Sequence, residues 1–193
     1  MVADSQRGRL LFAMVEVVAE KGYAATTVAD VVEHAGVSRR TFYEQYPSKE
    51  ACFLAAYDTG IEILLGRLRD AQAALGDIDW RARVRSDLET HLDLLAAQPS
   101  FARALHLEIL GAGPAALERR AQIFGIFAER SRGAYAMARI EDPSRPELPD
   151  EVFSFQIGGL DELVRECLRT RGAAALPEVA DAAVESTIAL LGG

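Results

Sequence analysis

The stretch that decides the fold runs from residue 27 to residue 49 and reads TVADVVEHAGVSRRTFYEQYPSK. Its first apolar residues recur at i, i+3, i+4 and i+7, which is the spacing of one face of an α-helix. These residues are Val28, Val31, Val32 and Ala35. Thr27 stands at the N-cap position, and Asp30 three residues later approximates a capping box. The pattern therefore predicts a short amphipathic helix that begins just after Thr27.

The second half of the stretch predicts another short helix after a tight turn. Gly36 and Val37 form the turn, Ser38 is placed to cap the next helix, and that helix runs through Tyr46. Pro47 ends it, because the residue before a proline disfavours the α conformation. Ser48 then caps a long helix that continues to about residue 75.

Helical periodicity also dominates the sequence outside this stretch, and no run of residues alternates as a strand would. A first helix carries Leu10 and Met14 on its apolar face and stops at Lys21 and Gly22. The later helices are predicted at roughly 79–97, 100–110, 114–139, 150–171 and 177–191. We therefore predict an all-α fold with a three-helix N-terminal head and a larger C-terminal helical body.

Two short helices joined by a glycine-containing turn are what a DNA-reading helix-turn-helix requires. The N-terminal end of the second helix in such a motif points at base edges. Arginine suits the acceptor pair on guanine, whereas hydroxyl groups, lysine and exposed N–H groups suit phosphates. The residues that we expect to contact DNA are Thr27, Ser38, Arg39, Arg40, Thr41, Tyr43 and Lys49. We expect Tyr46, in contrast, to pack in the core.

Residues 10–54 closely resemble the head of the tetracycline-repressor (TetR) family of bacterial regulators. The matching residues are Glu20-Lys21-Gly22-Tyr23, Thr26-Thr27-Val28, Ala35-Gly36-Val37-Ser38, Thr41-Phe42-Tyr43 and Ser48-Lys49-Glu50. The resemblance implies that the head binds operator DNA, that the body holds a small effector, and that the last two helices dimerise. It implies a DNA-binding domain over residues 1–50 and an effector-binding and dimerisation domain over residues 51–193.

The sequence departs from the family pattern at two positions of the head. Arg40 stands where the family usually has a small residue, and Gln45 stands where histidine is common. The operator sequence therefore does not carry over from any relative. Outside such a motif, Arg39 and Arg40 would be ordinary solvated charges of a helix surface.

Charge is distributed unevenly along the chain. The formal net charge of the 193 residues is −8, which on its own argues against a nucleic-acid partner. The first 57 residues, however, carry six basic and seven acidic side chains, so most of the excess negative charge lies in the body. The head is therefore able to approach a phosphate backbone.

The body contains aromatic residues and two histidines that are core residues in the simplest interpretation. The resemblance implies that some of them line an effector cavity, and the candidates are His91, Phe101, His106, Phe127 and Phe155. We saw no cationic cluster in the middle helices, so the expected effector is apolar or amphipathic with few polar groups. We expect neither a cofactor nor a metal, since both histidines are explained as ordinary core or surface residues.

The last two helices are the expected homodimer interface. The candidate contact residues are Phe153, Ile157, Leu160, Val164, Val179, Ala183 and Ile188. Gly158 and Gly159 lower helix propensity, so they indicate a close helix approach, a kink, or a helix end at residue 157.

The function predicted by these features is that of a ligand-responsive repressor that binds a palindromic operator as a dimer. Catalysis is not expected, because no nucleophile elbow or HExxH motif occurs and Asp161-Glu162 has the pattern of a solvated helix face. The alternatives are an all-α small-molecule-binding protein or enzyme with an incidental head, and a structural DNA-binding protein without an effector.

Cys52 and Cys167 lie in apolar patterns and are expected to be buried thiols. We expect a cytoplasmic protein with neither a signal peptide nor a membrane span.

Overall fold

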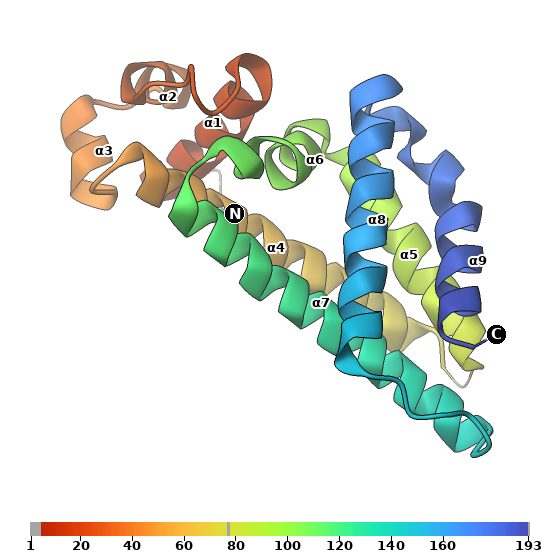
Figure 1. Cartoon of the computed structure of the whole chain (residues 1–193). Helices are drawn as coiled ribbons and strands as arrows, with labels where there is room; N and C mark the ends of the chain where they lie inside the picture. Colours follow the sequence, from red (N-terminus) through yellow and green to blue (C-terminus); the bar gives the residue numbers. More distant parts are fainter. Residues whose placement is uncertain (1–4, 77, 193) are drawn as a thin grey trace. The chain divides into compact units, whose positions relative to one another are not determined.

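The computed structural model of the chain describes residues 5–76 and 78–192, and every regular element in that part of the chain is helical (Figure 1). The elements are α1 (Gln6–Lys21), α2 (Val28–Ala35), α3 (Arg39–Gln45), α4 (Lys49–Ala74), α5 (Trp80–Ala97), α6 (Pro99–His106), η1 (Glu108–Gly111), α7 (Pro114–Glu141), α8 (Asp150–Thr170), η2 (Ala173–Val179) and α9 (Ala180–Leu190). The predicted all-α fold is confirmed.

Side-chain caps start the N-terminal helices where the sequence predicts them. Thr27 accepts a hydrogen bond from the N–H of Asp30, whose carboxylate accepts from the Thr27 N–H, so the capping box is complete. Ser38 caps α3 by accepting from the Thr41 N–H at 3.0 Å. Gly36 ends α2 in the left-handed region, with φ of 62°, which a side chain there would disfavour. These caps determine where α2 and α3 begin, and Gly36 determines where α2 ends.

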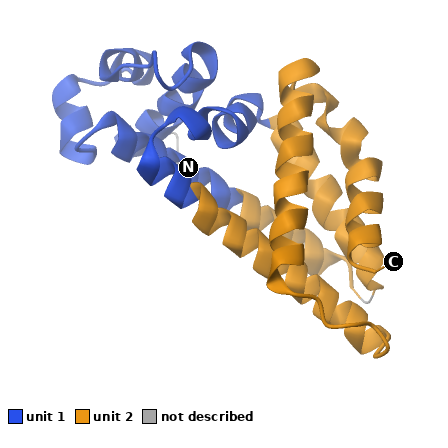
Figure 2. Cartoon of the chain, in the orientation of Figure 1, with its two compact units in different colours: residues 1–63, 98–119 blue, residues 64–97, 120–193 orange. Residues whose placement is uncertain are grey.

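The chain divides by packing into two compact units (Figure 2). Unit 1 comprises residues 1–63 and 98–119, and unit 2 comprises residues 64–97 and 120–193. Helices α4 and α7 each contribute residues to both units. The functional division after residue 50 stays a prediction, since it concerns what the two parts do rather than how they pack.

In unit 1, α1 packs against both α2 and α6, and α3 packs on α1 and α2. The apolar stripe of α1 supplies much of this core, as its periodicity indicates. Its larger apolar side chains that are at most 1% exposed include Leu10, Met14, Val18, Val31, Phe42, Phe53 and Ile109. The head therefore folds together with α6 and η1, which follow it by some fifty residues in sequence.

In unit 2, α5 packs against η2 and α9, and α8 packs against both of these as well. Trp80 at the start of α5 is buried, and the guanidinium groups of Arg81 and Arg145 each lie 5.0 Å from its ring. The Tyr135 hydroxyl donates to the Pro146 carbonyl at 2.8 Å, which ties the loop after α7 to the core.

Four of the residues expected at a dimer interface lie inside unit 2 instead. Phe153, Val164, Val179 and Ala183 are at most 8% exposed in the protomer. Their periodicity was interpreted as a subunit interface, but it is the stripe that packs α8, η2 and α9 onto their own unit. These four side chains are therefore already covered within the protomer.

Proline and local geometry change two of the expected helix boundaries. The segment that leads into α9 is the 3₁₀ helix η2, which contains Pro177, and α9 begins only at Ala180. The helix expected at about 100–110 ends at His106 and is followed by η1 as a separate turn. α8 runs through Gly158 and Gly159, so a helix end at residue 157 is wrong.

Both cysteines are buried free thiols, as expected. Burial raises the pKa of the Cys52 thiol to about 12. Across the described part of the chain, no helix is long and apolar enough to cross a membrane.

Candidate nucleic-acid interface and effector region

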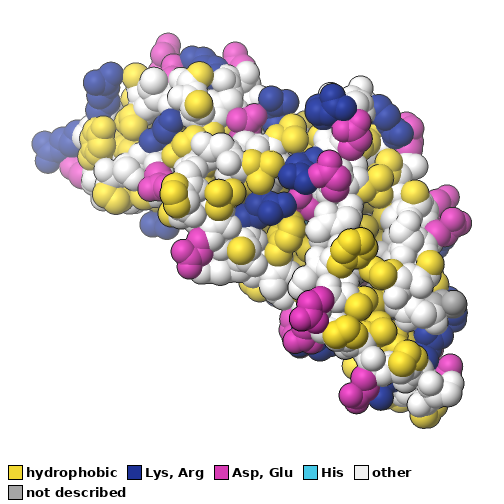
Figure 3. Space-filling model, in the orientation of Figure 1, with side chains coloured by type: hydrophobic (Ala, Val, Ile, Leu, Met, Phe, Trp, Pro, Cys, Tyr) yellow, Lys and Arg dark blue, Asp and Glu magenta, His cyan; other side chains and the backbone are white. Residues whose placement is uncertain are grey.

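The N-terminal end of α3 is basic and exposed to solvent. Arg39 is exposed, and the side chain of Arg40 is 89% exposed while its Nε donates to Glu44 Oε1 at 2.9 Å. On the opposite face of the same helix, Phe42 is fully buried. In Figure 3, Lys and Arg side chains project at the end of the molecule that carries α2 and α3. The short helix is therefore anchored by one aromatic side chain and directs its arginines to solvent.

Tyr43 on α3 and Tyr46 directly after it differ in burial as predicted. Tyr43 is 57% exposed and meets the edge of Phe42, with ring centroids 5.4 Å apart. Tyr46 is 4% exposed and lies under the guanidinium of Arg7, so its prediction as a core residue is confirmed. The Tyr43 hydroxyl remains a candidate phosphate donor.

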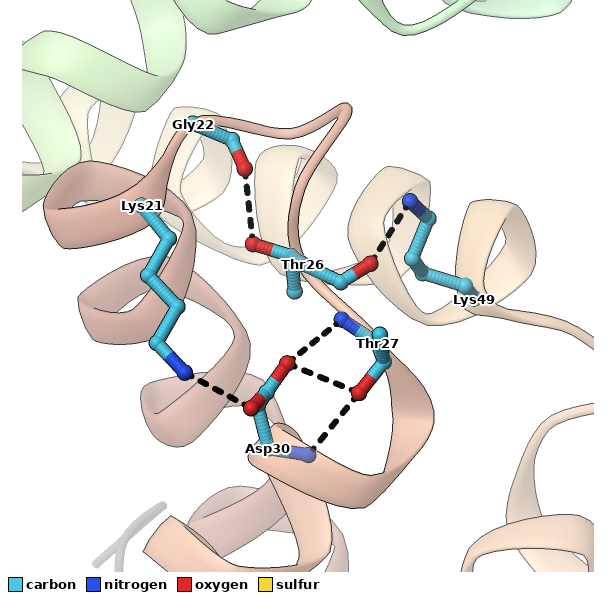
Figure 4. Close-up of polar contacts among 6 residues, drawn as sticks. All are labelled: Lys21, Gly22, Thr26, Thr27, Asp30 and Lys49. Atoms are coloured by element: carbon cyan, nitrogen blue, oxygen red, sulfur yellow. Dashed lines mark hydrogen bonds and ion pairs between the residues drawn. The ribbon is translucent and has the colours of Figure 1, made fainter.

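The hydroxyls of Thr27, Ser38 and Thr41 all take part in helix capping. Thr27 Oγ1 donates to Asp30 Oδ2 at 2.7 Å (Figure 4). Ser38 Oγ lies 3.0 Å from Thr41 Oγ1. Thr27 and Ser38 are exposed and Thr41 is half-buried. Their contact with DNA stays a prediction, and any such contact has to share these hydroxyls with the caps.

Lys49 has a role that its sequence position did not indicate. Its ammonium donates to the carbonyls of Tyr23 at 2.7 Å and Thr26 at 2.9 Å, and it lies 4.1 Å from the centre of the Tyr23 ring. Burial lowers the pKa of the Lys49 ammonium. Backbone carbonyls leave no mark in a sequence pattern, so only the fold reveals this contact. Lys49 thus joins the start of α4 to the loop before α2.

The expected effector residues fall into separate groups. His91 and Phe127 meet edge to face in unit 2, with ring centroids 5.7 Å apart. Phe101 and His106 both lie on α6 in unit 1, where His106 is 6% exposed. Phe155 is 73% exposed on α8, so it lines no cavity within unit 2. The exposure of Phe155 makes it the weakest of these candidates, and effector contact stays a prediction for all five residues.

Unit 2 holds a buried charge cluster that the sequence interpretation missed. Asp161 is 4% exposed, so its assignment to a solvated face is wrong. Arg120 Nη2 lies 2.5 Å from Asp161 Oδ2, and Arg165 Nε lies 3.4 Å from the same oxygen. Arg120 also stacks on Phe124, with its guanidinium carbon 4.0 Å from the ring centre. Two guanidinium groups therefore pair with a single buried carboxylate, and an aromatic ring packs on one of these guanidinium groups.

A second polar group lies close to His91 and Phe127 along the same helices. Arg130 Nη2 donates to Asp87 Oδ2 at 3.1 Å, and Gln72 Nε2 donates to Asp87 Oδ1 at 2.8 Å. Arg120 and Arg130 lie on α7, the helix of Phe127, and Asp87 lies one turn from His91 on α5. Both arginines are paired with carboxylates, so the expectation of middle helices without a cationic cluster stays a prediction.

The head matches a known family. Residues 10–56 match the model described as "Bacterial regulatory proteins, tetR family". The chain is 33% identical over 92 residues to the HTH-type transcriptional activator FasR of Mycolicibacterium smegmatis. This match covers 48% of this chain and 41% of FasR. It is 30% identical over 101 residues to the HTH-type transcriptional regulator EthR of the same organism, covering 52% of this chain and 46% of EthR. The matches thus span less than half the length of these curated relatives.

Solved structures share the fold of almost the whole chain. The fatty acid degradation regulator FadR of Bacillus halodurans matches 97% of this chain and 95% of its own, with a TM-score of 0.85 and 19% identity. FadR of Bacillus subtilis, solved in complex with stearoyl-CoA, matches with a TM-score of 0.82 and 19% identity, covering 93% of this chain and 96% of its own. The head of this chain, residues 10–56, therefore matches the tetR family of bacterial regulatory proteins, and the chain shares the fold of these two solved regulators.

Proposed function

We propose that the protein is a transcriptional repressor that binds a palindromic operator as a homodimer and releases it when a small amphipathic effector binds. The observation that carries the DNA-binding part is the geometry of α3. Phe42 is fully buried and anchors the helix, whereas Arg39 and Arg40 at its N-terminal end face solvent. That end of a recognition helix is the part that contacts base edges in the major groove.

The proposed dimer contact is the solvent-exposed face of α8. Phe155 is 73% exposed, and a Cβ built at Gly158 or Gly159 meets no atom within 4 Å. Figure 3 shows hydrophobic side chains on the visible side of unit 2, over α8. Small residues beside an exposed aromatic ring allow a second helix to approach closely. A two-fold dimer would present two heads to major grooves about 34–36 Å apart, so the operator should be an imperfect palindrome.

The proposed effector combines a long apolar part with an anionic group. His91 and Phe127 supply aromatic surface, and Arg120 and Arg130 of α7, which pair with Asp161 and Asp87 in this structure, are the candidate partners of the anionic group. The complex of the similarly folded Bacillus subtilis FadR with stearoyl-CoA supports an acyl thioester as the first compound to test. We keep repression as the proposed outcome, although FasR is named as an activator.

The function is tested with the full chain, a DNA fragment from upstream of its own gene, and fluorescence anisotropy. We expect saturable binding that an unrelated fragment does not compete away, and release by stearoyl-CoA but not by free coenzyme A. The double variant R39A/R40A should lose the preference for the specific fragment. In transcription assays the protein should lower transcript yield, and stearoyl-CoA should restore it.

Equal affinity for both fragments would contradict the operator assignment. Thermal stabilisation by stearoyl-CoA without DNA release would contradict its role as an inducer.

A further inference from the structure

The peptide of Tyr23 is held on both sides by charged side chains that are distant in sequence. Its N–H donates to Glu108 Oε2 at 2.9 Å, and its C=O accepts from Lys49 Nζ at 2.7 Å. Glu108 begins η1, 85 residues after Tyr23, whereas Lys49 begins α4. Hydrogen bonds to charged groups are stronger than neutral ones, so both contacts restrain the peptide firmly.

The restrained loop is connected directly to the start of the helix-turn-helix. Thr26 Oγ1 donates to the Gly22 carbonyl at 2.8 Å, and the Thr26 carbonyl accepts from Lys49 (Figure 4). The next residue is Thr27, the cap of α2, whose partner Asp30 also binds Lys21 at 2.7 Å. A shift of the Tyr23 peptide therefore reaches the first turn of α2 within four residues.

Glu108 is placed closely against this loop. Its side chain is 15% exposed, and its other carboxylate oxygen lies 3.2 Å from Arg103 Nη2 on α6. A Cβ built at Gly22 would lie 3.4 Å from Glu108 Oε2, so a small residue is favoured there, and φ of +81° at Gly22 favours glycine as well. A single carboxylate thus links the α6–η1 segment to the loop before α2.

We infer that Glu108 is a positioning residue for DNA binding, which fixes the placement of α2 and α3 through the Tyr23 peptide. The inference rests on the proposed function, because it assigns to Glu108 a role in reading the operator. It adds a residue outside the head to those that determine operator affinity. Any change in α6 or η1 is transmitted to the start of α2 through this contact.

The test compares the full-length variants E108A and E108Q with the wild type. The matched control is E118A, which removes an exposed glutamate on α7 in the same unit. Amide hydrogen exchange of residues 22–27 and the affinity for the upstream fragment, from fluorescence anisotropy, are measured for each protein.

E108A should speed exchange at Tyr23 and weaken specific binding by about tenfold, the effect expected from losing a hydrogen bond to a charged group. E108Q should recover part of both, because its amide oxygen still accepts from the Tyr23 N–H. E118A should match the wild type in both.

Three results would overturn the inference. The first is unchanged exchange at Tyr23 in E108A, which would mean that Glu108 does not restrain the loop. The second is faster exchange throughout α1 and α6, which would indicate a general loss of stability. The third is faster exchange at Tyr23 with unchanged specific binding, which would leave Glu108 with no role in reading DNA. A wild-type chain that binds no specific DNA would instead contradict the proposed function itself, and the inference with it.

Discussion

Gly60 on α4 and the ring of Phe101 on α6 are in direct contact, because a Cβ built at Gly60 would lie only 1.9 Å from Phe101 Cε2 and 2.4 Å from Cζ. Gly60→Ala should therefore destabilise the protein even though alanine favours a helix. The gain in propensity is about 1 kcal/mol, whereas overpacking costs about 1–3 kcal/mol. The measurement is the free energy of unfolding in urea.

Gly66 on the same helix is the matched control, since a Cβ there would meet only the end of Arg69, at 3.9 Å. Gly66→Ala should stabilise the protein by roughly 1 kcal/mol or less. The double variant Gly60→Ala with Phe101→Leu should recover part of the loss, because the smaller side chain relieves the overlap. If Gly60→Ala proves as stable as Gly66→Ala, the contact has no energetic importance.

Replacing Arg39 by Ala should lower operator affinity by about 1–3 kcal/mol and relax the base preference at one position of each half-site. Arg40→Ala should do the same if Arg40 leaves Glu44 to contact a base. Their ion pair is highly exposed and therefore worth little. Binding is measured against operators with single-base substitutions. A uniform loss across all these operators would show that the arginines contact phosphates rather than bases.

The parts of the head that the sequence predicted correctly depend on contacts between near neighbours. The caps formed by Thr27 and Ser38 join residues three positions apart, and the turn at Gly36 needs only a positive φ. Such contacts are visible in sequence spacing. The hydrogen bond between Glu108 and Tyr23 joins residues 85 positions apart, so no local pattern indicates it.

Helical periodicity also leaves the partner of an apolar stripe undetermined. Phe153 and Phe155 are two residues apart on α8, yet one is 2% and the other 73% exposed. The helical spacing of apolar residues correctly indicates that Phe153 lies on an apolar face of α8. It does not indicate that this face packs within the protomer rather than against a second subunit. Asp161 was misplaced for a related reason, because a charged residue in a helix is usually solvated unless a partner such as Arg120 pairs with it.

Lys49→Met should weaken binding to all DNA sequences by a similar factor. The salt dependence of the binding constant distinguishes the loss of a phosphate contact from the loss of order in the loop before α2. Loss of one phosphate contact would reduce the slope of log K against log salt by about 1. The carbonyls of Tyr23 and Thr26 already occupy two donors of the ammonium, so we expect the slope to change little and the loop to lose order. Titrations at several salt concentrations decide between these roles. A slope reduced by a full unit would restore Lys49 as a phosphate contact.

Phe155→Asp should convert the dimer to a monomer, since a carboxylate would replace an exposed ring at the proposed contact of α8. Ile140→Asp is the control, because Ile140 is 72% exposed at the end of α7. Sedimentation velocity at micromolar concentration should give a monomer for the first variant and a dimer for the second. Dissociation by Ile140→Asp alone would place the interface at the end of α7 instead.

Asp30→Asn should lower stability at neutral pH and lose this effect in acid. The hydrogen bond from Lys21, followed by those from Thr27, holds the pKa of the Asp30 carboxyl well below its usual range. A carboxyl whose pKa is lower in the folded state contributes stability above its unfolded pKa of about 3.9, and this contribution fades as pH falls towards the folded pKa. Unfolding free energies of both proteins should therefore differ most above about pH 5 and converge as the pH drops below 4. Ser38→Ala is the control, since it removes the hydroxyl cap of α3, which contacts only Thr41 and no titratable group, so its cost should persist further into acid. A difference between wild type and Asp30→Asn that stays constant down to pH 2 would show that the charge of Asp30 does not stabilise the start of α2.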